Sequence, residues 1–254
     1  MKTDYKGYLI DLDGTMYKGK SEIPEAKEFI RELQLRNIPF MFVTNNSSRT
    51  PGATAEKLKQ FGIEAESHQV MTASLATAIH IHDEKPNATA YVIGEVGLTE
   101  ALKEKGVQVV DGDADYVVMG IDRENTYRKL RDACLYVQEG AKFVATNPDI
   151  KVPTEKGLVP GNGAYVNLVE NVTGVKPEIV GKPSGLMLQI ALDYLGISQE
   201  EAIMVGDNYH TDILAGIHAG MDTLHVQTGV TTKDELTQFG IKPTYTIETL
   251  KDWF

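Results

Sequence analysis

The most constraining feature of the sequence is a short apolar segment that ends in two aspartates. The segment Tyr8–Ile10 leads into Asp11 and Asp13, which are separated by one leucine, and Gly14 follows at once. An apolar run of this length predicts a buried strand, and the glycine lets the chain turn away after it. If the strand continues through Asp13, alternation places the two aspartates on the same side of the backbone. Open α/β sheets bind ligands at the carboxyl ends of their strands, so both carboxylates are candidate functional groups.

Two carboxylates held this close cannot both remain ionised without help. A divalent cation can neutralise one of them, while the other keeps a proton that it can donate. A nucleophilic carboxylate, a proton donor and a Mg²⁺ site together indicate phosphoryl transfer. The alternative interpretation is an acidic turn that caps a helix, and the aspartate pair alone does not decide between the two.

Three further segments favour the catalytic interpretation. A second apolar strand, residues 39–43, runs into Thr44 and Asn45, whose side chains can donate hydrogen bonds to phosphate oxygens. A short apolar run then ends at Lys182, which offers a point charge for a phosphoryl group, and Pro183 is placed to open the following helix. Taken singly, the first of these strings is typical of a helix cap, and the second of a surface turn.

The last of these segments, residues 202–206, is a strand candidate that ends at Asp207. We expect Asp207 to complete the metal site, with Asn208 and Asp212 supporting it from behind. Asp212 would hold the Lys182 ammonium or a metal-bound water, although it could instead cap the next helix. Four polar strings, each at the carboxyl end of a predicted strand, favour one shared site over four unrelated turns.

These motifs resemble those of the haloacid dehalogenase (HAD) superfamily of phosphotransferases, over nearly the whole chain. Residues 11–15 are similar to its first motif, Thr44 to the second, Lys182 to the third, and Asp207 with Asp212 to the fourth. The strings Ala-Thr-Asn-Pro-Asp at 145–149 and Pro-Gly-Asn-Gly at 160–163 are similar to the NagD-like, class IIA branch. That branch includes nucleotide, sugar-phosphate and p-nitrophenyl-phosphate phosphatases.

The resemblance implies an α/β protein: a Rossmann-like parallel-sheet core formed by residues 1–79 and 180–254, and an inserted α/β cap formed by residues 80–179. The cap would close over the core site and determine substrate specificity. The implied roles are the nucleophile for Asp11, the general acid and base for Asp13, phosphate binding for Thr44, Asn45 and Lys182, Mg²⁺ binding for Asp11, Asp13 and Asp207, support for Asp212 and Asn208, and cap specificity for Asn147 and Asp149.

The expected function is Mg²⁺-dependent hydrolysis of small phosphate monoesters through an aspartyl-phosphate. Sugar phosphates, nucleoside monophosphates and p-nitrophenyl phosphate are the expected substrates. Halide displacement also uses an aspartate nucleophile, but it needs neither a second acid nor a metal ligand. Asp13 and Asp207 therefore argue against that reaction. The alternatives left open are a phosphotransferase or phosphomutase, and a catalytically silent sensor of phosphorylated metabolites.

Alternating strand and helix patterns continue along the chain and predict parallel sheets. We expect helices at 24–36, 51–61, 98–105, 127–138, 183–196 and 212–220, and strands at 89–94, 116–121, 142–146 and 223–227. Residues 153–163, rich in Gly and Pro, are expected to form an irregular loop.

The net charge of −11 argues against nucleic-acid binding. No apolar run is long enough to span a membrane, and no signal-type segment precedes the first strand, so a cytoplasmic protein is expected. Cys134 is the single cysteine, which excludes an intramolecular disulfide and fits a core position. The histidines at 210, 218 and 225 are expected to be structural, since oxygen ligands suit Mg²⁺. A small phosphorylated metabolite is the expected partner, and a homodimer is compatible with the sequence.

Overall fold

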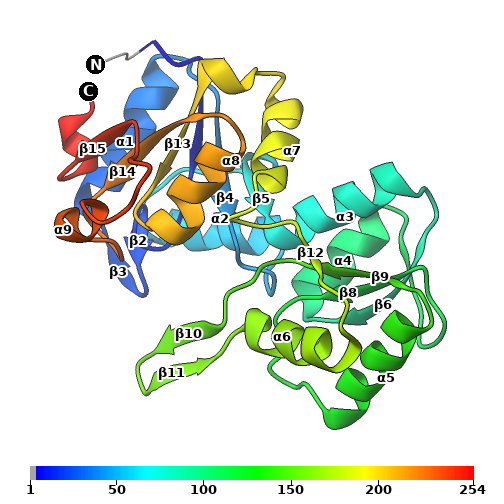
Figure 1. Cartoon of the computed structure of the whole chain (residues 1–254). Helices are drawn as coiled ribbons and strands as arrows, with labels where there is room; N and C mark the ends of the chain where they lie inside the picture. The colour runs from blue at the N-terminus through cyan, green and yellow to red at the C-terminus, as the bar shows by residue number, and fades with distance from the viewer. Residues whose placement is uncertain (1–3) are drawn as a thin grey trace. The chain divides into compact units, whose positions relative to one another are not determined.

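A computed structural model describes residues 4–254, so the first three residues of the expected core segment 1–79 lie outside it. The chain divides into two compact units. The first holds the described residues up to Thr44, with Pro51–Met71 and Lys182–Phe254; the second holds Asn45–Thr50 and Thr72–Gly181. Each unit is built on a mainly parallel sheet with helices packed on it (Figure 1), which confirms the α/β fold class.

The six-stranded sheet has the order β15-β14-β13-β1-β4-β5. Its strands are β1 (Gly7–Ile10), β4 (Phe40–Thr44), β5 (Val70–Thr72), β13 (Ala202–Gly206), β14 (Asp222–Val226) and β15 (Tyr245–Ile247). β1 pairs in parallel with both β4 and β13, and the strand residues of all three are buried. Strands buried on both faces are continuous apolar runs, as the sequence shows here.

The helices of the first unit follow the apolar spacing of the sequence. They are α1 (Pro24–Leu35), α2 (Pro51–Gln60), α7 (Leu186–Leu195), α8 (Leu214–His218) and α9 (Lys233–Leu236). In α1 the residues that the sequence spaces for one helix face are buried in the core: Ala26, Phe29, Ile30 and Leu33. The smaller elements are the hairpin β2 (Tyr17–Lys18) with β3 (Ser21–Glu22), the short turns η1 (Ser67–Gln69), η2 (Gln199–Glu201) and η4 (Leu250–Asp252), and the π-helical turn η3 (Tyr209–Ile213).

Two predicted helices of this unit begin later than expected. The helix predicted from Pro183 starts at Leu186, because the Ser184 hydroxyl accepts a hydrogen bond from the Leu186 N–H (3.2 Å) and holds a local turn. The helix predicted from Asp212 to Gly220 is replaced by η3 and the short α8. Asn208 caps η3 by accepting from the His210 N–H (3.0 Å).

The second unit contains a five-stranded parallel sheet with the order β12-β9-β8-β6-β7. Its elements are β6 (Thr89–Ile93), β7 (Gln108–Val109), β8 (Tyr116–Met119), β9 (Lys142–Ala145), β12 (Glu178–Ile179), α3 (Ala73–Glu84), α4 (Val96–Glu104), α5 (Tyr127–Gln138) and α6 (Asn162–Thr173). One sheet face packs against α5 and α6 around the buried Cys134, as its position in the sequence predicts. α3 and α4 lie on the opposite face (Figure 1).

The expected irregular loop at residues 153–163 is wrong. This stretch contains a β-hairpin, β10 (Lys151–Thr154) with β11 (Gly157–Pro160), and the start of α6. Proline is tolerated in this hairpin because β10 and β11 are both edge strands of a two-stranded sheet. Gly157 has a φ of +122°, a backbone conformation that favours glycine at the turn.

The expected domain boundary at residue 80 falls inside α3, whose residues from Ala73 onward belong to the second unit.

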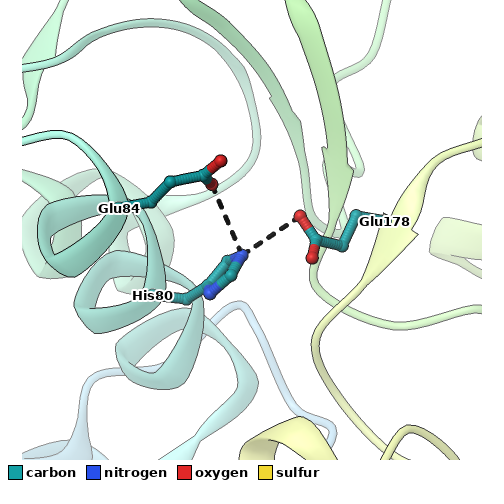
Figure 2. A group of neighbouring side chains, drawn as sticks. All are labelled: His80, Glu84 and Glu178. Atoms are coloured by element: carbon teal, nitrogen blue, oxygen red, sulfur yellow. Dashed lines mark hydrogen bonds and ion pairs between the residues drawn. The ribbon is translucent and has the colours of Figure 1, made fainter.

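Figure 2 shows a polar group that ties this helix to the sheet: His80 and Glu84 of α3 face Glu178 of β12. His80 Nε2 lies 3.1 Å from Glu178 and 3.8 Å from Glu84. Lys142 of β9 pairs with both carboxylates, at 2.6 and 2.8 Å. Lys142 therefore makes the group an ion-pair network.

Among residues 4–254, no helix combines the length and the apolar character needed to cross a membrane.

Trp253 anchors the end of the chain to the first unit. Its ring packs on Tyr5 and Tyr245, and its Nε1–H donates to the buried Tyr8 hydroxyl (2.9 Å). We expect Trp253→Ala to lower the free energy of unfolding by about 3–5 kcal/mol, because it opens a cavity and removes the donor to Tyr8. Urea denaturation followed by circular dichroism measures this loss. The exposed Tyr194→Ala is the control, and an equal effect of both variants would contradict the prediction.

Candidate active site

Three neighbouring strands of the first unit bring their polar ends to one edge of the sheet. In the register, Ile10 of β1 lies opposite Phe42 of β4 and Val205 of β13. Asp11 therefore follows β1 directly, and its N–H donates to the Val205 carbonyl (2.9 Å). Thr44 is the last residue of β4, and Asp207 comes directly after β13. Parallel pairing thus collects predicted site residues from distant parts of the sequence.

Lys182 is the centre of this group. Its side chain is buried, with 1% of the residue surface exposed. The ammonium donates to Asp11 Oδ1 (2.5 Å), to Asp212 Oδ1 (2.7 Å) and to the carbonyl of Val43 in β4 (3.0 Å). Lys182 therefore joins three segments that are far apart in the sequence.

Asp212 is held on both carboxylate oxygens. Oδ1 accepts from Lys182, and Oδ2 accepts from the backbone N–H of Asn208 (3.0 Å). The Thr211 hydroxyl also donates to Oδ1 (3.2 Å). With these bonds in place, Asp212 fixes the lysine from the π-helical turn η3, and Asn208 contributes through its backbone.

Asp207 is fully buried and is held by the loop that follows β14. Its Oδ2 accepts from the backbone N–H of Val230 (2.7 Å), and its Oδ1 accepts from the Thr15 hydroxyl (3.2 Å). A Cβ added at Gly229 would lie 1.8 Å from Oδ2, and one at Gly14 would lie 2.4 Å from the carboxyl group. The backbone therefore approaches this carboxylate more closely than any residue with a side chain allows.

Burial dominates the electrostatics of the carboxylates. It raises the pKa of Asp11 well above the usual range, assisted by Asp212 and Asp207 and opposed by Lys182. Burial, with Asp212 nearby, raises the pKa of Asp207 to about 7, against the opposing hydrogen bond from Val230. Burial alone would lower the pKa of Lys182, but the charges of Asp11 and Asp212 outweigh it and the pKa rises. Lys182 therefore stays protonated, and its single positive charge faces more than one buried carboxyl group.

Asp13 differs from the expectation that β1 extends through it. β1 ends at Ile10, and the chain turns, with the N–H of Met16 donating to the Leu12 carbonyl (2.8 Å). Gly14 has a φ of +101°, which ends the strand alternation on which that expectation relied. Asp13 is exposed, and its Oδ1 accepts from the Gly19 N–H (3.3 Å). The two aspartates therefore occupy different environments, one buried and one open to solvent.

The other three predicted site residues lie in the second unit. Asn45, directly after Thr44, donates its side-chain amide to Asp149 Oδ2 (3.2 Å). Asn147 donates to the backbone carbonyl of Asn45 (2.8 Å). Asn147 and Asp149, which the sequence resemblance implied as specificity determinants, therefore both contact Asn45, the first residue after β4.

The first-unit cluster suits a hard divalent cation. One oxygen from each of Asp11, Asp207 and Asp212 lies within 4.8 Å of the others, and all three residues are buried. Three buried carboxylates face one ammonium group, so the donor set is rich in anionic oxygen, which Mg²⁺ and Ca²⁺ prefer. The backbone at Gly14 and Gly229 packs closely against the Asp207 carboxyl group and holds it in one orientation, as a metal ligand requires.

Sequence reasoning gave no role in this site to Thr15 or to the loop at residues 228–231, and it expected His225 to be structural. The buried His225 lies with its Nε2 2.9 Å from the Asp207 carbonyl, which also accepts from the Thr231 N–H (3.2 Å). Burial lowers the pKa of His225, so the imidazole is neutral and donates from Nε2. A signal was present: Thr228 and Gly229 follow a predicted strand, as the other site segments do.

Comparison with known proteins agrees with this geometry. A haloacid dehalogenase-like hydrolase model matches residues 8–108, and a HAD-hydrolase-like model matches residues 179–253. The 5'-nucleotidase YutF of Bacillus subtilis is 52% identical over 253 residues, covering 100% of this chain and 98% of that protein. The acid sugar phosphatase of Staphylococcus aureus is 48% identical over 249 residues, covering 98% and 96%.

Solved structures are similar over the same length. A mutant of the thermostable p-nitrophenylphosphatase from Bacillus stearothermophilus is 52% identical, with a TM-score of 0.92 and 99% of each chain covered. NagD from E. coli K-12 is 31% identical, with a TM-score of 0.92 and 97% of each chain covered. The chain therefore belongs to the haloacid dehalogenase-like hydrolase family, within which it is a NagD-like phosphoric monoester hydrolase.

Proposed function

We propose that the protein hydrolyses phosphate monoesters of small metabolites, with Mg²⁺, through an aspartyl-phosphate on Asp11. The observation that carries this proposal is the placing of Asp11: a buried carboxylate directly after β1, bonded to Lys182 and close to Asp207. Similarity to a 5'-nucleotidase and an acid sugar phosphatase supports nucleoside monophosphates and sugar phosphates as substrates.

In the proposed reaction, a carboxylate oxygen of Asp11 attacks phosphorus while the leaving alkoxide departs on the opposite side. Lys182 bonds to Asp11 Oδ1, which orients the carboxylate and favours its ionised form against the effect of burial. Asp13, which is exposed, protonates the alkoxide and then takes a proton from the water that hydrolyses the aspartyl-phosphate. Thr44, and the segment that begins at Asn45, bind the phosphoryl oxygens.

Mg²⁺ would be held by Asp11, Asp207 and the backbone carbonyl of Asp13, with Asp212 and Asn208 supporting the site. When bound, it supplies positive charge to the phosphoryl oxygens and to the buried carboxylates. The loop at Gly229 and Val230 holds the Asp207 carboxylate in one orientation for this role. Asp212 contributes by fixing Lys182, to which its Oδ1 is bonded, while its Oδ2 accepts from the backbone N–H of Asn208.

We further propose that the second unit selects the leaving group, as the cap expected from the sequence would. The hairpin β10–β11 supports this role, because its residues are exposed apart from the half-buried Val152. Hydrolysis of a panel of esters by the purified protein tests the proposed function. The panel contains a hexose phosphate, a nucleoside 5'-monophosphate and p-nitrophenyl phosphate, and phosphate release is measured with Mg²⁺ present. Release from none of them would reject the proposal.

Asp11→Asn is expected to abolish turnover, because the amide has the same shape but cannot attack phosphorus. Asp13→Asn is expected to lower kcat by about 10²–10⁴-fold, and more for alkyl esters than for p-nitrophenyl phosphate, whose leaving group needs little protonation. Steady-state kinetics with both ester types measures this difference. If Asp11→Asn kept substantial activity, the covalent mechanism would be wrong.

Activity is expected to require Mg²⁺, to disappear with EDTA and to return on adding Mg²⁺. Ca²⁺ is expected to inhibit, because its larger coordination shell favours bidentate carboxylates and would engage both oxygens of Asp11. Phosphate release over a titration of each cation checks this. Full activity after exhaustive chelation would exclude a metal role for Asp11 and Asp207.

Gly14→Ala is expected to weaken Mg²⁺ binding by about 10-fold or more, because its Cβ would meet the Asp207 carboxyl group at 2.4 Å. Gly19→Ala is a matched control. Gly19 also has a positive φ, of +60°, but nothing lies within 4 Å of its added Cβ. Calorimetric titration with Mg²⁺ compares the two variants, and equal loss in both would assign the effect to backbone strain alone.

A further inference from the structure

The segment from Asn45 to Thr50, here called the connecting segment, leaves β4 directly after Thr44 and belongs to the second unit. Side chains and backbone groups of that unit hold it along its length. The Ser74 hydroxyl donates to the Ser47 carbonyl (2.9 Å), and the Ile121 N–H donates to the Ser47 hydroxyl (3.0 Å). The Gly97 N–H donates to the Ser48 carbonyl (3.1 Å). The connecting segment is therefore a fixed structure and not a simple surface turn.

The first residue of the connecting segment is held by Asn147. The side-chain Nδ2 of Asn147 donates to the Asn45 carbonyl at 2.8 Å. The Asn45 side chain in turn donates to Asp149 Oδ2 (3.2 Å). Both ends of Asn45, backbone and side chain, thus depend on the turn at residues 147–149.

Asn147 is itself fixed and has little room for a ligand. Only 4% of its surface is exposed, and its side-chain oxygen accepts from the Asp149 N–H (3.1 Å). Its backbone carbonyl accepts from Nδ2 of Asn162 (2.9 Å), which also donates to the Met119 carbonyl (3.1 Å). Asn162 is buried as well, at 2% exposed. A chain of neutral amides therefore runs from β8 through Asn162 and Asn147 to Asn45.

We infer that Asn147 is a positioning residue for phosphate binding rather than a specificity contact with the leaving group. It fixes the backbone of Asn45 and so sets the direction in which the chain leaves Thr44, the residue proposed to bind the phosphoryl oxygens. This inference rests on the proposed phosphatase function. It replaces the role in specificity that the sequence resemblance implied for Asn147.

Asn147→Asp tests the inference with almost no change in shape. The variant keeps an oxygen that accepts from the Asp149 N–H but loses the N–H that donates to Asn45. We expect kcat/KM to fall by about 10-fold or more, and by the same factor, for a hexose phosphate, a nucleoside monophosphate and p-nitrophenyl phosphate. The control is Asn171→Asp, since Asn171 is an exposed asparagine of α6 whose amide donates only within its own helix, to Asn167 (2.6 Å). Its kinetics should match those of the wild type.

Inhibition by inorganic phosphate supplies a second measurement. Phosphate carries no leaving group, so a residue that only contacts the leaving group cannot change its inhibition constant. We expect Asn147→Asp to raise this constant by about the same factor by which kcat/KM falls. Asp149→Leu, which removes the acceptor for the Asn45 amide, should resemble Asn147→Asp.

Two results would overturn the inference. An unchanged phosphate inhibition constant with altered ratios between esters would make Asn147 a leaving-group contact. Unchanged kinetics with only a lowered melting temperature would make it structural. If Asn147→Asp does not fold, Asn147→Ser takes its place, because a serine hydroxyl still accepts from the Asp149 N–H but is too short to reach Asn45. If the wild type hydrolyses no ester, the proposed function fails separately, and calorimetry with inorganic phosphate on both proteins still measures positioning.

Discussion

The first unit depends on one buried cation. Lys182 donates to Asp11, Asp212 and the Val43 carbonyl, so a single ammonium connects β4, the turn after β1 and the turn after β13. A buried lysine is costly unless it is paired, and removing one partner leaves an uncompensated charge. The three segments are therefore coupled, because a shift of any one of them would leave the Lys182 ammonium without one of its buried partners. This coupling explains why residues from far apart in the sequence keep one geometry.

Much of this was predictable because parallel sheets place strand ends at one edge. Each apolar run that ends in a polar residue, as at Asp11, Thr44 and Asp207, predicted both a strand and a site residue, and the register aligns the three. The inner face of α1 followed from its 3.6-residue spacing. These features are local in the sequence, or follow from a rule of topology, and so need no knowledge of packing.

The features that were missed depend on tertiary contacts. The hairpin β10–β11 has few apolar residues and two prolines, so its pattern favours a loop, and only strand pairing reveals it. Asp13 leaves the strand because the turn at Gly14 is set by hydrogen bonds to Leu12 and Tyr17. The family resemblance implied a specificity role for Asn147, which stays a prediction, whereas its burial and its bond to Asn45 could be seen only in the folded chain.

The balance of charge bears on how an anionic substrate could bind here. The protein carries a net charge of −11, and Lys182, the cation at the centre of the described cluster, is already matched by two carboxylates. Asp207 adds a third acid, and burial, with the charge of Asp212 nearby, raises its pKa to about 7. The lysine therefore cannot by itself attract a phosphate dianion. The asparagine amides around Asn45 are neutral and one of them donates to the Asp149 carboxylate, so this network adds no positive charge. A divalent cation bound with these carboxylates, as proposed above, would supply the missing positive charge.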